Sequence, residues 1–493
     1  MGEVKVKFEF DDSVMAKVLY VSAVIVLGLM VYVAVFYPFL SVDEWFTKGL
    51  LSYSAIDQIR ITAIDVHPPL YYMILNAFVK TLAALHINLD LIVSLKIVSV
   101  IPYFIVLGLS LTRVRKRYGE LTGGLFAFSL IAMSTFFTQY LTARMYSWAL
   151  LFIVAGFLCV RPILEDNNLK HWILLSVFAA LGAYTHYFTA IAFISLYVIL
   201  FSYILIKRRE FIRNWILSSA VGIVLYVPWI LKLLRQVSKV ESDYWIPQVD
   251  LKTVLDCVSS VLFVDMSTFI SLAVFIVLMV FVALILRDFI KNRSADDEYM
   301  LMGILTFFIT ILVGCVISLI SQPILRIRYV APVSALIWIL ISIYIGKIDL
   351  KKAAVVLSVA LLIVGAANVC VQMDEIHEFH DKTFKDLNTL SKLNKNDTII
   401  IFEGMQKYFR FNEELNNTKM FCSYELNNKS IQQNYAKILN LGDDVFKIPY
   451  DIDKYPESKV YYIHDHKSNM TPVDGYNFTD KYRVQNSKVT RIS

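Results

Sequence analysis

The chain has 493 residues, of which 57% are hydrophobic and only 18% are charged, and its mean hydropathy is +0.59. Soluble globular proteins average about 45–50% apolar and about 25% charged residues, so this composition excludes a single soluble domain. The formal net charge of +6 does not indicate a nucleic-acid partner, because the excess lies in loops of an apolar region, where basic residues set membrane topology.

The charged residues divide the chain into two parts. Residues 372–493 hold 17 Lys and Arg and 18 Asp and Glu, as in an ordinary soluble domain, whereas the first 371 residues are strongly apolar. We therefore expect an α-helical polytopic membrane body over residues 1–371. A small soluble α/β domain is expected over residues 372–493, with a helix at 374–393 and strands at 398–402 and 459–463.

Apolar runs long enough to cross a bilayer, which needs about 20 residues, recur along the body. The first has no small-residue cleavage site and is expected to be a signal anchor. About eleven crossings are predicted, at residues 18–40, 90–112, 121–137, 146–160, 172–186, 189–206, 215–233, 269–286, 299–320, 331–346 and 353–371.

A further apolar run, from His67 to Leu85, contains Lys80 and is ambiguous. If it does not cross, 19 Lys and Arg fall on one side of the membrane and nine on the other, as the positive-inside rule requires. We therefore expect an interfacial or re-entrant helix here, on the outer side. The odd number of crossings then places the C-terminal domain outside the cell as well.

The first long outer loop, residues 41–66, opens with the carboxylates of Asp43 and Glu44. Ionisable groups at a membrane interface are functional candidates by default, but acidic residues also suit the first turn of a helix. Position alone leaves both interpretations open. Apolar residues at helical spacing predict one amphipathic helix on the membrane surface; they are Trp45, Phe46, Leu50, Tyr53 and Ile56.

The same loop ends in Asp65 and His67, followed by two prolines and Tyr71. Because prolines fix the backbone before a helix, Asp65 and His67 are expected on a rigid turn. A helix cap for Asp65 and a structural role for His67 are the alternatives, although the whole string is more specific than either residue.

Three arginines lie on the predicted outer side of a protein that keeps most of its basic residues inside: Arg144, Arg326 and Arg328. They could extend toward lipid headgroups, a common use of arginine at helix ends, or bind a phosphate group in pairs of hydrogen bonds. Candidate pocket residues lie beside them or in the neighbouring outer loop, namely Gln139, Tyr146, His186 and Tyr329. A packed interfacial role is the alternative for His186.

Taken in order, these motifs resemble one family over the whole 371-residue body. They are Asp43-Glu44, HPPLYY from His67, the Gln139 to Tyr146 segment, Thr185-His186-Tyr187, Tyr244-Trp245-Ile246-Pro247 and the late Arg328-Tyr329 with Pro332. The string is similar to the polyprenyl-phosphate-sugar-dependent glycosyltransferases of the GT-C fold, the protein O-mannosyltransferase-like and lipid A aminoarabinose transferase-like group.

The resemblance implies transfer of a sugar, with inversion, from a dolichyl or undecaprenyl phosphate to an acceptor protein, lipid or glycan on the extracytoplasmic face. Asp43 matches the general base, and Arg328 matches the arginine that steadies the lipid phosphate. Glu44 and the His67 region would shape the same pocket. The chemistry of the residues agrees, since inverting transfer needs one base and a cation for the leaving phosphate.

The sequence departs from the family at Thr142, where many relatives carry an acidic residue. A second carboxylate, and a divalent cation that would use it, are therefore left open, with Asp65 or Glu44 as substitutes. The alternative function is a transporter or flippase for a lipid-linked or small polar substrate, and Lys96, inside a predicted span, is the feature that fits it. We prefer the transferase because the ionisable candidates gather at one interface.

Overall fold

The computed structural model describes residues 12–65, 67–133, 141–239, 246, 248–261, 268–348, 351–403, 408–409, 411, 415, 418–423, 459–465, 478–484 and 487–492. By their contacts, the residues form two compact units. The body comprises Met1–Val35, Ala55–Leu89 and Val93–Gln372, and the tail unit comprises Phe36–Ser54, Asp90–Ile92 and Met373–Ser493. The domain boundary predicted between residues 371 and 372 treats each domain as one continuous segment, and it stays a prediction.

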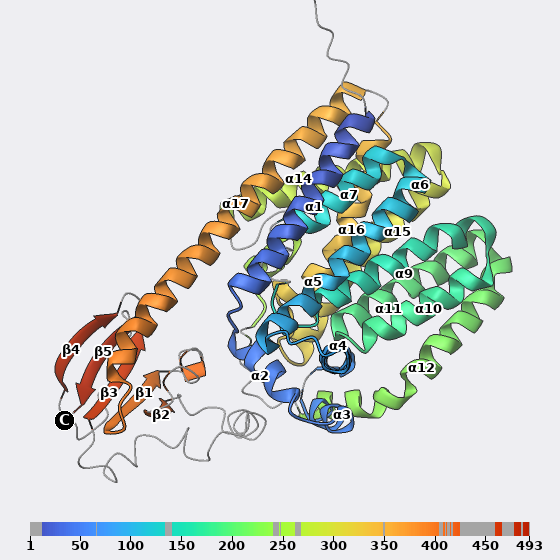
Figure 1. Ribbon diagram of the computed structural model, residues 1–493. Coiled ribbons are helices and arrows are strands. Elements are labelled where there is room, and N and C mark those ends of the chain that lie inside the picture. Colours follow the sequence, from blue (N-terminus) through green and yellow to red (C-terminus); the bar gives the residue numbers. More distant parts are fainter. Residues whose placement is uncertain are drawn as a thin grey trace, which may run out of the picture. The chain divides into compact units, whose positions relative to one another are not determined.

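Nine helices in the described chain are long and apolar enough to cross a membrane, which makes this a multi-pass membrane protein (Figure 1). They are α1 (Asp12–Phe36), α5 (Leu91–Leu109) continued by η1 (Ser110–Val114) and α6 (Arg115–Tyr118), α9 (Tyr146–Asp166), α11 (Tyr187–Lys207), α12 (Ile212–Lys239) preceded by η2 (Arg209–Phe211), α14 (Thr268–Asn292), α15 (Ala295–Ile320), α16 (Ile327–Gly346) and α17 (Lys351–Leu390) followed by η3 (Ser391–Leu393).

Two of the eleven predicted spans are shorter helices. The runs at 121–137 and 172–186 correspond to α7 (Glu120–Ala132) and α10 (Leu169–Ala183), of 13 and 15 residues. In α7 every residue after Glu120 is buried. Gly123 and Gly124 contribute to this packing, because a Cβ at either position would lie within 3.0 Å of an atom of α1. The apolar run after His67 forms α4 (Leu70–Ala84), also 15 residues long.

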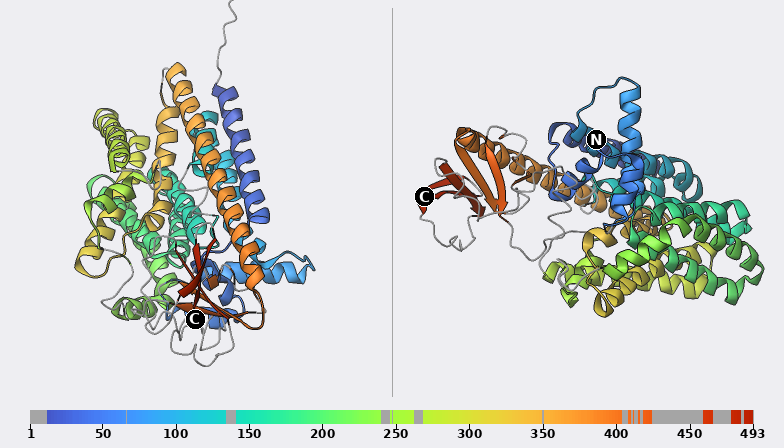
Figure 2. Two further views of the ribbon diagram at one scale, coloured as in Figure 1. Left: turned by 90° about the vertical axis from the view of Figure 1, so that its left-hand side faces the viewer. Right: turned by 90° about the horizontal axis from the view of Figure 1, so that it is seen from below.

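Helix α16 lies in the middle of the body, against α7, α9 and α15, and these neighbours are visible in Figures 1 and 2. In the apolar stretch of α16, 83% of the residues are buried, compared with 11% in the apolar stretch of α12. The hydroxyls of Ser334 and Ser342 donate hydrogen bonds to backbone carbonyls of the same helix. These polar side chains can therefore be buried in α16 at little cost in free energy. Packing of this kind fixes the ends of the helices, where the polar residues gather.

The tail unit contains a five-stranded sheet in the order β2-β1-β3-β5-β4. Strand β1 (Thr398–Glu403) pairs in parallel with β2 (Lys419–Ser423) and β3 (Lys459–Asp465). Strands β5 (Ser487–Ile492) and β4 (Phe478–Val484) follow in antiparallel pairing. The two strands and the α/β fold class predicted from the sequence are confirmed. The predicted helix at 374–393 is the second half of α17, which runs without a break for 40 residues, about 60 Å.

The single amphipathic helix predicted in residues 41–66 is wrong, because the structure has two helices there. Helix α2 (Val42–Leu50) ends in a turn at Leu51–Tyr53, and α3 (Ala55–Thr62) follows. Ser52 Oγ donates to the Gly49 carbonyl at 2.6 Å, which satisfies the end of α2. The break matters because α2 belongs to the tail unit and α3 to the body. The remaining described helix is α13 (Leu251–Ser259).

Candidate active site

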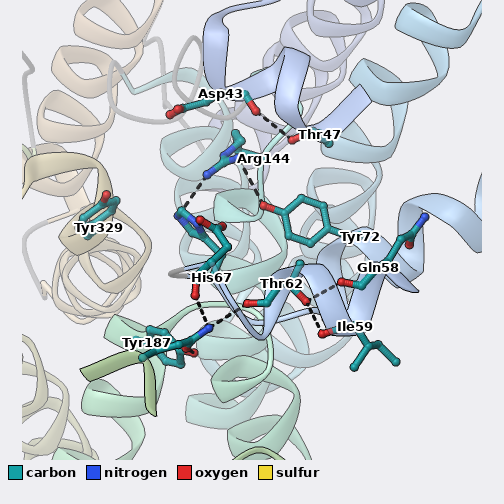
Figure 3. Close-up of polar contacts among 12 residues, drawn as sticks. Asp43, Thr47, Gln58, Ile59, Thr62, His67, Tyr72, Arg144, Tyr187 and Tyr329 are labelled. Atoms are coloured by element: carbon teal, nitrogen blue, oxygen red, sulfur yellow. Dashed lines mark hydrogen bonds and ion pairs between the residues drawn. The ribbon is translucent and has the colours of Figure 1, made fainter. Parts of the chain in front are cut away.

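A chain of hydrogen bonds joins four side chains of the body, Asp65, His67, Tyr72 and Arg144, which we call the arginine–histidine cluster (Figure 3). Arg144 Nη2 donates to His67 Nε2 at 3.1 Å, and Nη1 donates to the Tyr72 hydroxyl at 3.3 Å. His67 Nδ1 lies 3.0 Å from Asp65 Oδ2. Because a guanidinium can only donate, His67 Nε2 must accept. The imidazole proton is therefore on Nδ1, where it is donated to Asp65.

This order of donors explains how the body holds a buried cation. Arg144 is 4% exposed, and a buried charge is costly unless it is paired and hydrogen-bonded. The Asp65 carboxylate supplies the opposite charge through the neutral His67 ring. The Tyr72 hydroxyl, itself on the first turn of α4, accepts from the other arm of the guanidinium.

The turn that carries Asp65 and His67 is held from three sides. Pro68 and Pro69 are buried and fix the backbone before α4. The amide N–H of Leu70 donates to the Tyr184 carbonyl at 3.1 Å, between α10 and α11. From α12, Gln236 Nε2 donates to the carbonyl of Asp65 and, at 2.8 Å, to that of Thr62. The predicted rigid turn is thus present in the structure.

The segment that carries Arg144 is held separately. Ser99 Oγ on α5 donates to the Thr142 carbonyl at 2.8 Å, and the Tyr71 hydroxyl lies 3.4 Å from the same Ser99 oxygen. Tyr71, predicted as a pocket residue, is fully buried here. Its hydroxyl contact with Ser99 supports the backbone beside Arg144, whereas its neighbour Tyr72 contacts the guanidinium.

Aromatic rings from three helix starts pack beside each other in the body, and we call them the aromatic cluster: Tyr146, His186, Phe188 and Tyr329. The His186 ring centroid lies 5.0 Å from that of Tyr329 and 5.7 Å from that of Tyr146. Three predicted pocket residues, far apart in the sequence, are therefore in contact. They come together because α9, α11 and α16 begin at the same end of the body (Figure 1).

His186 is the electrostatic link between the two clusters. It precedes α11 and accepts the Phe188 amide N–H on Nδ1 at 3.2 Å, which makes it an N-cap. Burial lowers the pKa of His186 well below its usual value, and the charges of Arg144 and Arg328 lower it further. Both arginines therefore act on one neutral, buried imidazole.

Arg328 and Arg326 lie at the start of α16. The Arg328 guanidinium carbon is 5.3 Å from the centre of the Tyr329 ring, a cation–π contact. Arg326 is the N-cap residue of α16. Ser318 Oγ accepts the amides of Ile324 and Leu325 at 3.0 and 3.1 Å, so the loop before α16 is fixed from α15.

The two predicted catalytic carboxylates lie on α2, in the tail unit. Glu44 is 2% exposed, and its Oε2 accepts the Ser41 amide N–H at 2.8 Å in a capping box. Asp43 is partly exposed, and its carbonyl accepts from Thr47 Oγ1 at 3.1 Å (Figure 3). The sequence left a cap and a functional site as alternatives for the pair. The structure shows a cap for Glu44.

Sequence reasoning missed three residues of the body site: Tyr72, Gln236 and Tyr187, whose hydroxyl donates to Gln236 Oε1. Tyr72 and Tyr187 had a signal, since they stand in the motifs that singled out Tyr71 and His186, whereas Gln236 had none. Gln139 and Tyr244, Trp245 and Pro247 lie outside the described residues. Across the described ranges, no three His, Cys, Asp or Glu side chains gather as a metal site.

The body site is suited to an anionic group. Arg144 and Arg328 are donors with permanent positive charge, the Tyr72 and Tyr329 hydroxyls can donate as well, and His186 is neutral. Guanidinium groups bind the oxygens of phosphate or carboxylate in pairs of hydrogen bonds, and partial burial strengthens that attraction.

The arrangement of the helices identifies the fold: this chain has the GT-C fold predicted from its sequence. The crystal structure of ArnT from Cupriavidus metallidurans in the apo state is similar, with a TM-score of 0.58, 10% identity, and 96% of this chain and 97% of that chain covered. The same protein bound to undecaprenyl phosphate gives a TM-score of 0.57 at 10% identity, with the same coverage.

A second solved structure, from an archaeon, is also similar to this chain. The Archaeoglobus fulgidus oligosaccharyltransferase in the apo form gives a TM-score of 0.53 at 11% identity, over 93% of this chain and 70% of that one. No protein-family model matches the sequence, and no curated protein matches it. At sequence identities of 10–11%, the structural similarity establishes the fold of this chain alone.

Proposed function

We propose that this protein is a membrane glycosyltransferase that moves a sugar from a polyprenyl phosphate to an acceptor on the extracytoplasmic face. The observation that carries the proposal is the arginine–histidine cluster around the buried Arg144, whose charge acts on His186 together with that of Arg328, in a body with the GT-C fold. One solved protein with this fold binds undecaprenyl phosphate, which supports a lipid-phosphate donor here.

In the proposed reaction, an acceptor oxygen or nitrogen attacks the anomeric carbon of the sugar as the bond from that carbon to the phosphate oxygen breaks. Asp43 takes the proton of the acceptor, acting as the general base. The leaving polyprenyl phosphate gains one negative charge, which Arg144 and Arg328 would stabilise. Attack opposite the leaving group inverts the anomeric carbon. The leaving group needs no general acid, so a neutral His186 is compatible with this chemistry.

The test is a transfer assay with the purified full-length protein in detergent and a panel of radiolabelled undecaprenyl- and dolichyl-phosphate sugars. We expect wild type to release polyprenyl phosphate from one donor. Asp43→Asn should reduce that release by about 10²–10⁴-fold, the usual contribution of a general base. Asp57→Asn is a matched control, because Asp57 is an exposed carboxylate paired with Arg60 on α3.

Full transfer by Asp43→Asn would remove Asp43 from the role of base. The second candidate, a transporter or flippase, is favoured by Lys96, which is 7% exposed within α5. Binding of the lipid donors without any turnover would support that candidate instead.

A further inference from the structure

Helix α2, which carries Asp43, packs in the hydrophobic core of the tail unit. Trp45 is 8% exposed, and its ring stacks on Phe409, with the centroids 5.9 Å apart and the planes at 24°. Leu40 and Val42 pack against the same core. The other members come from the sheet, the segment after β1 and the end of α17; they are Leu390, Ile400, Phe402, Tyr408, Phe411, Leu415, Cys422, Tyr461 and Ile463.

The segment that leads into α2 is attached to α17 in the same unit. The Tyr37 ring lies 5.0 and 4.9 Å from the rings of His377 and His380, and Phe39 lies 5.7 Å from Phe379. Residues 37–45 are thus in contact first with the second half of α17 and then with the core beneath the sheet. Stacked and edge-on aromatic pairs add to the stabilisation from burial, so this attachment is specific in geometry.

The packing also sets the rotation of α2 about its axis. Val42 and Trp45 are three residues apart, so they share the face that contacts the core. Asp43 is two residues before Trp45, about 200° around the helix, and is therefore on the opposite face. The capping box between Ser41 and Glu44 fixes where the helix begins. With the start and the rotation both fixed, the direction of the Asp43 side chain follows.

We propose that the tail unit positions the catalytic base: Trp45 and Phe409 are positioning residues that orient Asp43 for transfer. The proposal rests on the role of Asp43 given above. It assigns the C-terminal sheet a task in the reaction. It also explains why an apolar ring from the first loop completes a core whose sheet begins more than 300 residues later in the chain.

The experiment compares Phe409→Ala, which removes the ring under Trp45, with Phe421→Ala. Phe421 is a matched control, because it is a phenylalanine of the same unit that is about as buried as Phe409 but lies outside this core. It alternates with Met420 and Cys422 along β2, so its side chain is on the other face of the sheet. For each full-length variant, we would measure kcat and KM for the donor, the melting temperature, and hydrogen exchange of the α2 amides.

We expect Phe409→Ala to lower kcat by at least about tenfold, since misplacement of a catalytic group by about 1 Å can cost about 100-fold. The KM for the donor should change little, and exchange in α2 should rise. Trp45→Phe, which keeps an aromatic ring, should retain most of kcat. Phe421→Ala should lower the melting temperature without these effects. Equal loss of kcat and equal α2 exchange in the two Phe variants would overturn the proposal.

Hydrogen exchange separates this proposal from the proposed function. If wild type turned over no donor, the glycosyltransferase assignment would fail, but exchange would still test the packing. Faster α2 exchange in Phe409→Ala alone would then support positioning of α2 by the tail unit, and identical exchange in the two variants would overturn it.

Discussion

In the body, Asp65 contacts His67 through a 3.0 Å hydrogen bond, and its carbonyl accepts from Gln236. In the tail unit, the helix that carries Asp43 is secured by Trp45 packing on Phe409. A hydrogen bond depends steeply on distance and angle, whereas an apolar contact tolerates substitutions that conserve volume. Isosteric changes that remove one polar atom should therefore weaken the body site, and changes in side-chain volume should weaken the packing of α2 in the tail unit.

The largest effect is expected from Arg144→Met, which keeps most of the side-chain volume and removes the charge. His67 Nε2 and the Tyr72 hydroxyl would lose the guanidinium that donates to them, and the charge proposed to bind the lipid phosphate would be removed. We expect binding of undecaprenyl phosphate to weaken by at least about 100-fold, measured by equilibrium binding in detergent. Arg144→Lys should recover little, because an ammonium group does not reproduce the fork that reaches both His67 and Tyr72.

Arg60→Met is the control for that substitution, since Arg60 is 74% exposed and its pair with Asp57 contributes little. Unchanged lipid binding in a folded Arg144→Met protein would show that the arginine–histidine cluster only stabilises the body.

A smaller loss is expected from Tyr72→Phe, which removes a single hydroxyl. That oxygen accepts from Arg144 at 3.3 Å, and a hydrogen bond to a charged group is worth about 1.5–3 kcal/mol. Transfer or lipid binding should fall by roughly tenfold or more. Tyr71→Phe should have a much weaker effect, because the Tyr71 hydroxyl lies 3.4 Å from Ser99 Oγ, and a long hydrogen bond between two neutral groups is worth less than one to a charged group. Equal losses in the two variants would contradict the separation between the two tyrosines.

Stability should depend on pH through His186. Its pKa is lowered by burial in the folded state, so below about pH 6.5 the unfolded chain binds a proton that the folded protein does not. Stability is therefore lost as the pH falls through that value, by at most about 1.4 kcal/mol per pH unit. His186→Asn keeps an N-cap acceptor and has no titrating group. Its melting temperature should drop less between pH 7.5 and 5.5 than that of wild type.

The same drop in both proteins would show that His186 does not carry this dependence. Comparison of wild type with His186→Asn at pH 7.5 gives the cost of the substitution itself. The change in melting temperature between pH 7.5 and 5.5 then gives the effect of protonation separately.

The smallest effect is expected from Glu44. Because its carboxylate caps α2, Glu44→Ala should cost about 1 kcal/mol of stability, and Glu44→Gln should cost less, since an amide oxygen can replace the cap. Transfer by Glu44→Gln should stay within about tenfold of wild type. Abolished transfer, as expected for Asp43→Asn, would instead place Glu44 in the chemistry.

Most of the candidate body site could be found from the sequence because its signals are local. The pair of prolines after His67 predicted the rigid turn, and arginines at the starts of apolar helices predicted a cationic site. The choice between Tyr71 and Tyr72 could not be made, because it depends on the rotation of α4 against α5 and the Arg144 segment. Gln236 was missed for a related reason, since it binds backbone carbonyls more than 170 residues away.

The sequence by itself determined the membrane body, the approximate positions of its spans and the order of its polar motifs, because hydrophobic length and helix-breaking residues act within one turn or one span. Tertiary structure decided which side chains meet. It joined His67 to Arg144, shortened two spans to α7 and α10, and placed Trp45 in a core with Phe409. Such contacts arise from packing between segments distant in the chain, so no local pattern of residues encodes them.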